Sequence, residues 1–317
     1  MKVLVLGAGA VGGYFGGRLH QGGADVTFLL REARAAKVGK EGLVLKSGKG
    51  DAVLPVKTIT RGGDGGPYDV ILLTCKAYDL DSAMDAIAPA VGAQTTIVPM
   101  LNGLAHLDTL DRRFGPEKVV GGLARIGAVL GPDGEVRHTS PFAAISFGER
   151  SGKPARPSLT ALDAACRKAG IDGGLNANID QDLWDKWIML ASLAAMCCTL
   201  RGTTGDIMAA EDGEALMLET VEECRKVAAA EGFDPGEKGI ANLKTYLTQR
   251  GSGFAASMLG DLERGGPIEG RHVIGDMLAR ARRHGIAAPN LRVAYAVVQA
   301  YEARRARGGL AGSTKQP

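Results

Sequence analysis

Apolar and polar positions follow two different periods along the chain. In residues 1–175, short apolar runs are separated by helical stretches such as Ala10 to Gln21. The runs predicted as strands are Lys2 to Leu6, Asp25 to Leu30, Val70 to Thr74, Thr96 to Leu101 and Val119 to Ile126. This alternation is typical of parallel βαβ units with helices on both faces of a sheet. Leu43 to Val56 and Glu135 to Phe147 predict additional β structure.

Helical periodicity takes over from residue 176 onward. It predicts helices at Gln181 to Leu200, Ala209 to Glu231, Phe254 to Arg264, His272 to His284 and Leu291 to Arg304. The glycine-rich, polar stretch "KAGIDGGLNANID" precedes this change and is typical of a domain junction. A chain of 317 residues also exceeds the usual size of one hydrophobic core. We therefore predict an α/β domain over residues 1–175 and an all-α domain over residues 176–317.

The composition excludes several classes of protein. A net charge of +3 gives no large single-sign field, so no nucleic-acid partner is expected. The longest apolar run, Trp187 to Leu200, is short for a membrane span and is interrupted by Ser192 and Thr199. The N-terminal "MKVLVLGAGAVGG" fits a buried strand and turn better than a signal peptide. We expect a cytoplasmic protein without a membrane partner.

The number and spacing of the cysteines predict neither disulfide bonds nor a metal site. Five are present, an odd number, and they show neither a CxxC motif nor a Cys/His ligand spacing. Reduced thiols and no bound metal are therefore expected. The sequence does not decide the oligomeric state, and a homodimer stays open.

The segment "VLVLGAGAVGG" has glycines in the spacing G-x-G-x-x-G, directly after an apolar strand and before a helix. Gly7 permits a tight turn, Gly9 lets a pyrophosphate approach the backbone, and Gly12 lets helix and strand pack closely. The N–H groups at the helix start offer donors and a positive dipole end to phosphate. A structural glycine turn without a ligand is the alternative. The pattern predicts a dinucleotide-binding loop made of Gly7, Ala8, Gly9, Ala10, Val11 and Gly12.

The end of the second strand bears on which dinucleotide binds. In "DVTFLLREAR", Arg31 stands where NAD enzymes usually carry an acid, and arginine pairs with a 2′-phosphate. Arg34 is a second candidate for that phosphate. Glu32 favours the opposite choice, because a shift of one residue would place its carboxylate on a ribose hydroxyl. We expect the cofactor NADPH, with NADH as the alternative.

Polar side chains follow two further predicted strands. Ligands of open α/β sheets bind beyond the carboxyl ends of the strands, and Lys76 and Asn102 both lie there. An ordinary surface lysine and an Asn-Gly turn explain their positions equally well. In the helical half, Ser257 precedes a helix and Glu269 follows the break "RGGP". On spacing alone, a helix cap and a solvated loop acid are the favoured interpretations of these two residues.

Lys186 in "DQDLWDKWIML" is harder to explain as a routine surface charge, because Trp184, Trp187 and Ile188 surround it in the sequence. A buried stem with the ammonium at a rim is one explanation. If the ammonium faces a bound ketone, it can instead donate a proton to the ketone oxygen as hydride arrives at the carbon. Lys186 is therefore a candidate general acid.

Taken in order, these motifs resemble the ketopantoate reductase (2-dehydropantoate 2-reductase) family. The motifs are "GAGAVGGYFGGRL", the arginine after the second strand, "CKAYD", "LNG", "LWDKW", "SMLGDLERGGPIE" and "ARRHGI", and they span nearly the whole chain. The resemblance implies a Rossmann-type NADP-binding domain, a helical substrate domain and NADPH-dependent reduction of ketopantoate to pantoate, a step of pantothenate biosynthesis. It also implies roles for the matching residues. These are Lys186 as general acid, Glu269 as the carboxylate that positions substrate and lysine, Asn102 near nicotinamide and substrate, Ser257 on the substrate carboxylate, and Lys76 and Arg31 on the cofactor.

The chain departs from the family pattern on the helix that carries the lysine. Family members commonly have asparagines one and two turns after it, where this chain has Leu190 and Ala194. Residues i, i+4 and i+8 share a helix face, so this wall is more apolar here. The segment "GRHVIG" after Glu269 also lacks the acid and the asparagine often found there. A site that loses hydrogen-bonding groups loses selectivity for a hydroxylated substrate.

The sequence thus predicts an NADPH-dependent reductase of a small-molecule 2-oxo acid, with ketopantoate as the leading substrate. A reductase of a more apolar 2-oxo acid or an imine is one alternative. A non-catalytic NADPH-binding redox sensor is an alternative from a different class.

Overall fold

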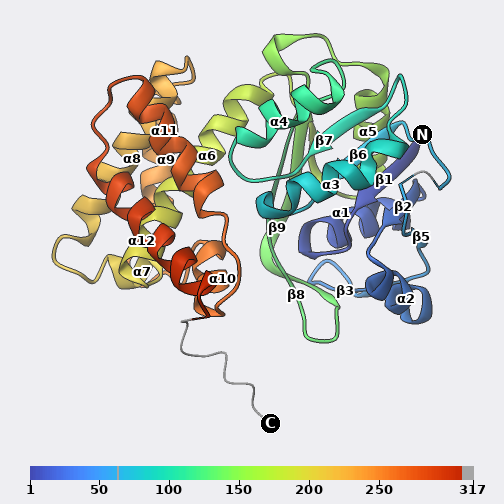
Figure 1. The fold of residues 1–317 in the computed structure, drawn as a ribbon, viewed down its shortest axis with the longest axis horizontal. Helices are drawn as coiled ribbons and strands as arrows, with labels where there is room; N and C mark the ends of the chain where they lie inside the picture. The colour runs from blue at the N-terminus through green and yellow to red at the C-terminus, as the bar shows by residue number, and fades with distance from the viewer. Residues whose placement is uncertain (63, 309–317) are drawn as a thin grey trace. The chain divides into compact units, whose positions relative to one another are not determined.

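The computed structural model describes residues 1–62 and 64–308 (Figure 1). The backbone divides into a first unit, Met1–Leu101 with His106–Asp180, and a second unit, Asn102–Ala105 with Gln181–Pro317. The division at Asp180 falls inside a helix. The short segment Asn102–Ala105 belongs with the second unit although it directly follows strands of the first.

The first sheet of the first unit is parallel throughout, and its strand order is β5-β2-β1-β6-β7. Its strands are β1 (Lys2–Leu6), β2 (Asp25–Leu29), β5 (Lys57–Ile59), β6 (Val70–Leu73) and β7 (Thr96–Pro99). Val3, Leu4 and Val5 of the central strand are fully buried, as expected for a strand covered on both faces. Because β2 and β6 flank β1 on opposite sides, the strand order reverses at β1, which is where such sheets bind ligands.

Helices follow most strands of this sheet. They are α1 (Ala10–Gln21), α2 (Glu32–Glu41), α3 (Leu80–Ile87) and α4 (Ala105–Phe114), with short 3₁₀ turns η1 (Ala77–Asp79) and η2 (Ala88–Ala90). The predicted helix Ala10 to Gln21 is confirmed residue for residue. The Rossmann-type fold class of the α/β half is confirmed as well.

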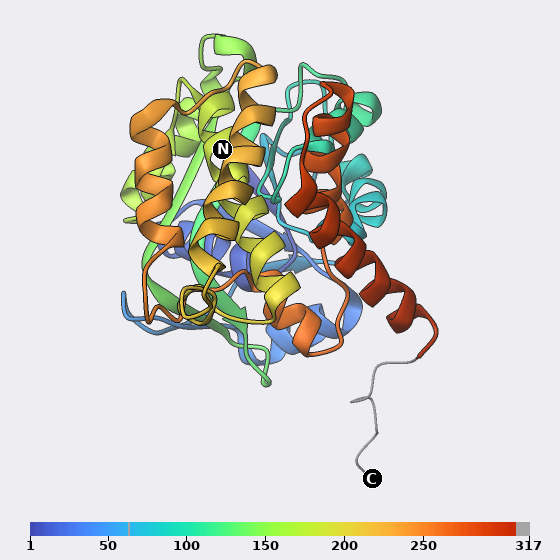
Figure 2. The same ribbon diagram turned by 90° about the vertical axis from the view of Figure 1, so that its left-hand side faces the viewer.

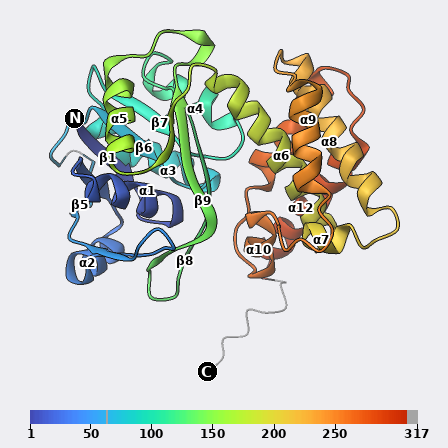
Figure 3. The same cartoon turned by 180° about the vertical axis from the view of Figure 1, so that it is seen from behind.

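A second sheet completes the first unit (Figure 3). It contains β3 (Leu43–Lys46), β4 (Ala52–Leu54), β8 (Gly121–Leu130), β9 (Val136–Gly148) and β10 (Asp172–Leu175). Between β9 and β10 the chain forms η3 (Arg150–Gly152) and α5 (Pro157–Lys168). The prediction that Val119 to Ile126 continues the parallel series is wrong in its pairing. β8 runs antiparallel to β9, and only Val119 forms a parallel bridge, to Ile97. The turn "GPDG" explains this, because it closes a hairpin with Gly131 N donating to the Glu135 carbonyl at 2.8 Å.

Helix α1 lies in the core shared by the two sheets. Its Phe15 and Leu19 belong to one buried cluster with Phe28 of β2 and Leu45 of β3. A side chain at position 16 would press against Phe28, and one at position 17 against Leu45. The glycine pair in "YFGGRL" therefore serves helix packing, whereas the preceding glycines form the loop described below.

The second unit is helical, as predicted (Figure 2). It contains α6 (Ile179–Leu200), α7 (Thr204–Ile207), α8 (Gly213–Ala230), α9 (Gly236–Leu247), α10 (Ser257–Glu263), a π-helical segment η4 (Arg271–Gly275), α11 (Asp276–Arg283) and α12 (Pro289–Ala306). α11 and α12 pack on each other and on α8. The buried Glu223 of α8 accepts the N–H groups of Asn290 (2.9 Å) and Leu291 (3.0 Å), so a carboxylate caps the start of α12.

Helix α6 is the central apolar helix of this unit. Within the described residues it is the one helix that is long and apolar enough to cross a membrane, with a mean hydropathy of 1.3 in its most apolar stretch. However, 67% of that stretch is buried inside the protein. Such burial is typical of a core helix.

Candidate active site

The glycine loop after β1 has the geometry of a phosphate-binding turn. Gly7 has a φ of 92°, a conformation that side chains rarely adopt, and its N–H donates to the Leu29 carbonyl at 3.0 Å. A Cβ at Gly12 would overlap Thr74 Oγ1 and the Gly7 carbonyl oxygen. Thr74 itself donates to the Leu6 carbonyl at 2.7 Å. The loop is thus held between the carboxyl ends of β1 and β6, and Thr74 is a supporting residue that the sequence did not reveal.

The start of α1 suits an anion. Gly9 is the N-cap and provides no side-chain hydrogen bond, and a Cβ at Gly9 would meet nothing within 4 Å. The first N–H groups of α1, from Ala10 and Val11, therefore border open space at the positive end of the helix dipole. The Arg34 guanidinium donates to the Ala8 carbonyl at 3.0 Å, and this hydrogen bond stabilises the loop. These features fit the pyrophosphate of a dinucleotide.

Arg31 lies at the carboxyl end of β2, as the N-cap of α2. Its side chain is 82% exposed and pairs with Asp79 Oδ1 at 3.3 Å. Asp79 ends the turn η1 that begins directly after Lys76, so Arg31 and Lys76 lie on neighbouring segments at the same edge of the sheet. Glu32 is exposed in the first turn of α2. An exposed arginine with one exposed partner can turn toward a ligand phosphate at little cost.

In the second unit, Lys186 and Asn102 meet. Lys186 Nζ donates to Asn102 Oδ1 at 3.1 Å, across 84 positions of sequence. Helix α6 produces this placement by burying the neighbouring tryptophans on another face. Trp184 and Trp187, three residues apart, contact each other with ring centroids 5.0 Å apart, while Lys186 stays half-buried. Lys186 thus lies on a different face of α6 from the two tryptophans, and its ammonium donates to the Asn102 amide.

The tryptophan face of α6 is fixed on both sides. The Arg280 guanidinium of α11 lies over both rings, 5.4 Å from the centroid of Trp184 and 5.3 Å from that of Trp187. Phe233 stacks on Trp184 at 5.7 Å. These contacts orient the turn of α6 that carries the lysine.

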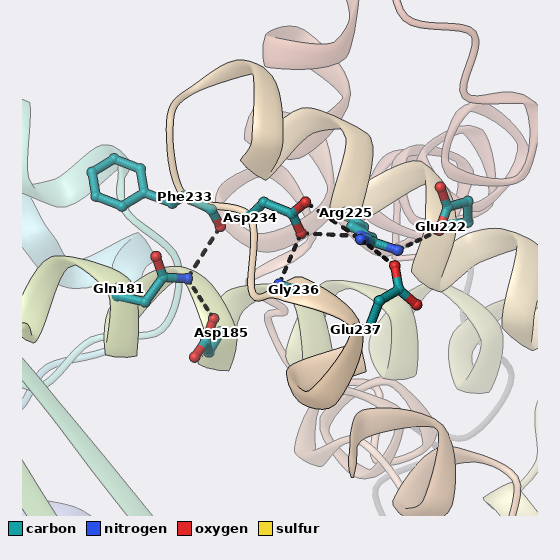
Figure 4. Close-up of polar contacts among 8 residues, drawn as sticks. All are labelled: Gln181, Asp185, Glu222, Arg225, Phe233, Asp234, Gly236 and Glu237. Carbon is teal, nitrogen blue, oxygen red and sulfur yellow. Dashed lines mark hydrogen bonds and ion pairs between the residues drawn. The ribbon is translucent and has the colours of Figure 1, made fainter. Parts of the chain in front are cut away.

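The first turn of α6 is also tied to the loop between α8 and α9 (Figure 4). Gln181 Nε2 donates to Asp185 Oδ1 at 2.8 Å and to the Phe233 carbonyl at 3.2 Å. Arg225 of α8 holds the next residue, Asp234, with 3.0 Å between Nε and Oδ1, and lowers the pKa of that carboxyl. The loop therefore clamps the helix directly before the lysine.

Glu269 and Ser257 differ in their surroundings. Glu269 is only 7% exposed, so the solvated-acid interpretation is wrong. It lies one turn before His272 in the π-helical region, and its charge acts on that imidazole. Ser257 is exposed and is the first residue of α10, whose N-cap is Ala256 without a side-chain hydrogen bond, so the cap interpretation is wrong too. The neighbouring Ala256 N–H bonds the Cys197 thiol of α6.

The face of α6 beyond Lys186 is apolar. Leu190 is half-buried and Ala194 is 3% exposed. Cys197 continues the same face eleven residues after Lys186, about 16 Å along the helix axis. The stripe from Lys186 to Cys197 therefore carries no amide side chain.

The thiols offer no reactive group in the helical unit. Burial raises the pKa of Cys198 and Cys224 to about 12 and raises that of Cys197. Within residues 1–62 and 64–308, no three His, Cys, Asp or Glu side chains are grouped as metal ligands.

Comparison with known proteins identifies the family. Residues 3–152 match the family model "Ketopantoate reductase PanE/ApbA", and residues 178–302 match "Ketopantoate reductase PanE/ApbA C terminal". The chain belongs to the ketopantoate reductase family. The resemblance seen in the sequence is therefore confirmed, and the chain is an oxidoreductase of this family.

Individual family members differ in what is known of them. The protein named "Uncharacterized oxidoreductase YkpB" from Bacillus subtilis (strain 168) is 35% identical over 307 residues, covering 96% of this chain and 100% of that protein. The crystal structure of 2-dehydropantoate 2-reductase from Geobacter metallireducens GS-15 has a TM-score of 0.86 and 28% identity, covering 95% of this chain and 99% of that one.

The same fold also occurs with a different substrate. A ternary structure of D-mandelate dehydrogenase with NADH and anilino(oxo)acetate has a TM-score of 0.86 at 20% identity, covering 96% of this chain and 99% of that one. At this identity the likeness concerns the fold alone. The fold by itself therefore does not decide the substrate.

Proposed function

We propose that this chain reduces a 2-oxo acid to the 2-hydroxy acid with NADPH, and that 2-dehydropantoate is the substrate. The observation that carries the proposal is the 3.1 Å hydrogen bond from Lys186 Nζ to Asn102 Oδ1. An ammonium has three N–H donors, so a bond to a neutral amide can orient it while a different N–H meets a substrate oxygen. A positioned proton donor is what reduction of a ketone requires.

In the first unit, the chain's part is to bind and orient the cofactor. The loop from Gly7 to Gly12 and the start of α1 would hold the pyrophosphate, Arg31 the 2′-phosphate, and Lys76 a further group at the end of β6. When bound, reduced nicotinamide supplies the hydride, and that chemistry belongs to the cofactor.

In the second unit, the chain's part is to hold the substrate and supply a proton. The carbonyl carbon gains a hydride and the carbonyl oxygen gains a proton, so the C=O group becomes C–OH. Lys186 donates this proton from Nζ and afterwards regains one from water. Asn102 keeps the ammonium in place, and we assign the buried Glu269 to positioning substrate and lysine. We assign the Ser257 hydroxyl to the substrate carboxylate on the basis of the family resemblance.

A second candidate is reduction of a more apolar 2-oxo acid or of an imine. Leu190 and Ala194 favour it, because both occupy the α6 face below Lys186 and neither can hydrogen-bond a substrate hydroxyl. Pockets built to bind a hydroxyl reject an analogue that lacks it by large factors, whereas apolar pockets discriminate weakly. This candidate predicts broad activity on apolar 2-oxo acids.

A substrate panel tests the proposal. NADPH oxidation is followed with ketopantoate, a series of branched apolar 2-oxo acids and a cyclic imine, and kcat/KM is compared. The highest value with ketopantoate supports our assignment, and the highest value with an apolar acid or the imine supports the second candidate. NADPH binding without oxidation by any of them would overturn both and leave a cofactor-binding sensor. Leu190→Asn is the matched variant, and it should raise the relative kcat/KM for ketopantoate.

A further inference from the structure

His272 lies beside the Asn102–Gly103 turn of the proposed active site, in the segment "GRHVIG" that departs from the family pattern. It belongs to η4, where Glu269 O accepts two N–H groups, from His272 at 3.0 Å and from Val273 at 2.9 Å. A π-helical turn places side chains at angles that a regular helix does not allow, and such turns occur often at functional sites.

The imidazole contacts the turn that carries Asn102. A ring N–H of His272 bonds the backbone carbonyl of Asn102. Gly103, with a φ of 76°, lies directly against the ring, since a Cβ there would be 3.0 Å from His272 Cδ2 and 3.3 Å from Nε2. A larger residue at this position would push the ring away. Ring and turn are therefore fitted to each other.

A second contact ties the π turn to α6. Trp187 Nε1 donates to the Val273 carbonyl at 3.0 Å, and this bond is buried. The contacts form a closed circuit, in which Lys186 bonds Asn102, Asn102 bonds His272, and the adjoining Val273 bonds Trp187, the residue after the lysine. A closed circuit fixes each member more firmly than separate bonds would, because one cannot shift without straining the next.

The electrostatic surroundings suit a neutral imidazole. Burial lowers the pKa of His272, while the nearby Glu269 and Asp276 carboxylates and the Asn102 carbonyl act in the opposite direction with smaller effect. A neutral imidazole has a single N–H donor, and here the Asn102 carbonyl receives it. The contact therefore persists through neutral pH.

We propose that His272 is a positioning residue that fixes the Asn102–Gly103 turn, so that Asn102 Oδ1 holds the Lys186 ammonium where it donates its proton. This inference rests on the proposed reductase function and adds a residue to it. His272 acts through Asn102 and is not assigned a contact with substrate. A residue that only fills space would tolerate any side chain of similar size.

Three variants separate positioning from packing. His272→Phe keeps a ring but removes the donor, and His272→Gln keeps an N–H donor. His284→Phe is the matched control, since His284 lies in the same unit, bonds Glu231 at 3.0 Å and is no part of the circuit. For His272→Phe we expect kcat to fall about ten- to a hundredfold, because small misplacements of reacting groups lower the rate by such factors. The dissociation constant of NADPH should stay unchanged. His272→Gln should recover most of the loss.

Two readouts distinguish this from partial unfolding. The solvent deuterium isotope effect on kcat should rise in His272→Phe, because proton donation becomes slower, whereas a smaller folded fraction lowers kcat without changing the isotope effect. Amide hydrogen exchange of residues 100–105 should also increase in His272→Phe alone. Wild-type kcat in His272→Phe, or equal losses in the Phe and Gln variants with an unchanged isotope effect, would overturn the proposal.

The two proposals fail in different ways. If the wild-type protein reduces no substrate of the panel, the reductase proposal fails, and hydrogen exchange still decides the role of His272. Exchange in residues 100–105 that is the same in wild type and His272→Phe would then overturn the positioning role. If wild type is active and His272→Phe is equally active, only the positioning role is overturned.

Discussion

Replacing Arg31 with alanine tests the choice of cofactor. The side chain is 82% exposed, follows β2 directly and pairs with Asp79 at 3.3 Å. Arg31→Ala removes the guanidinium but leaves the glycine loop and the start of α1 intact, because neither depends on this side chain. The variant should therefore bind the part common to NADPH and NADH as well as wild type does.

The size of the effect follows from two opposing contributions. A hydrogen bond between a charged donor and a phosphate contributes about 1.5–3 kcal/mol. To make it, Arg31 gives up an exposed ion pair worth about 0–1 kcal/mol, and solvent screening favours the lower part of the range. A net loss of about 1–2 kcal/mol corresponds to a weakening of roughly 5- to 30-fold.

Cofactor fluorescence gives the dissociation constants of NADPH and NADH without any substrate. For Arg31→Ala we expect the NADPH constant to rise by about 5- to 30-fold and the NADH constant to change less than about twofold. Arg167→Ala is the control, since Arg167 is a 77% exposed arginine of the same unit that pairs with Asp163 at 2.8 Å. Tighter binding of NADH than NADPH by wild type, or an unchanged NADPH constant in Arg31→Ala, would refute the reasoning and direct attention to Glu32.

Two further substitutions and one labelling experiment have expected outcomes. Lys186→Ala should lose most turnover while its NADPH dissociation constant stays at the wild-type value, and steady-state rates equal to wild type would end the general-acid role. Gly12→Val should abolish NADPH binding, because the new side chain collides with Thr74 and the Gly7 carbonyl; calorimetric titration would show retained binding if the loop were unimportant. Ellman's reagent at pH 8 should leave Cys166, Cys198 and Cys224 unmodified in folded protein, because burial raises the pKa of each thiol to about 12; fast reaction of all three would contradict this burial.

The cofactor end of the molecule could be predicted from sequence because its signals are local. Strand, glycine loop and helix follow one another without interruption from Lys2 to Gln21, so one short stretch of sequence contains the whole pattern. The predicted helix bounds agree with α1 for the same reason. The long apolar helix α6 was equally visible from its composition.

The partners of Lys186 could not be predicted from spacing, because contacts between distant segments decide them. Asn102 lies 84 positions from the lysine and belongs with the helical unit although it follows strand β7. The π turn at His272 has no sequence signal, since "RHVIG" fits an ordinary helix equally well. The pairing of β8 with β9 depended on a hairpin turn that the apolar pattern alone did not reveal.

The fate of the transferred atoms tests the central claim most directly. NADPH carrying deuterium at the nicotinamide carbon that gives up hydride is incubated with ketopantoate and enzyme, and the product is examined by proton NMR. The account predicts pantoate with deuterium on its hydroxyl-bearing carbon for wild type and almost none for Lys186→Ala at equal cofactor occupancy. Absence of deuterated product from wild type with every 2-oxo acid of the panel would contradict it.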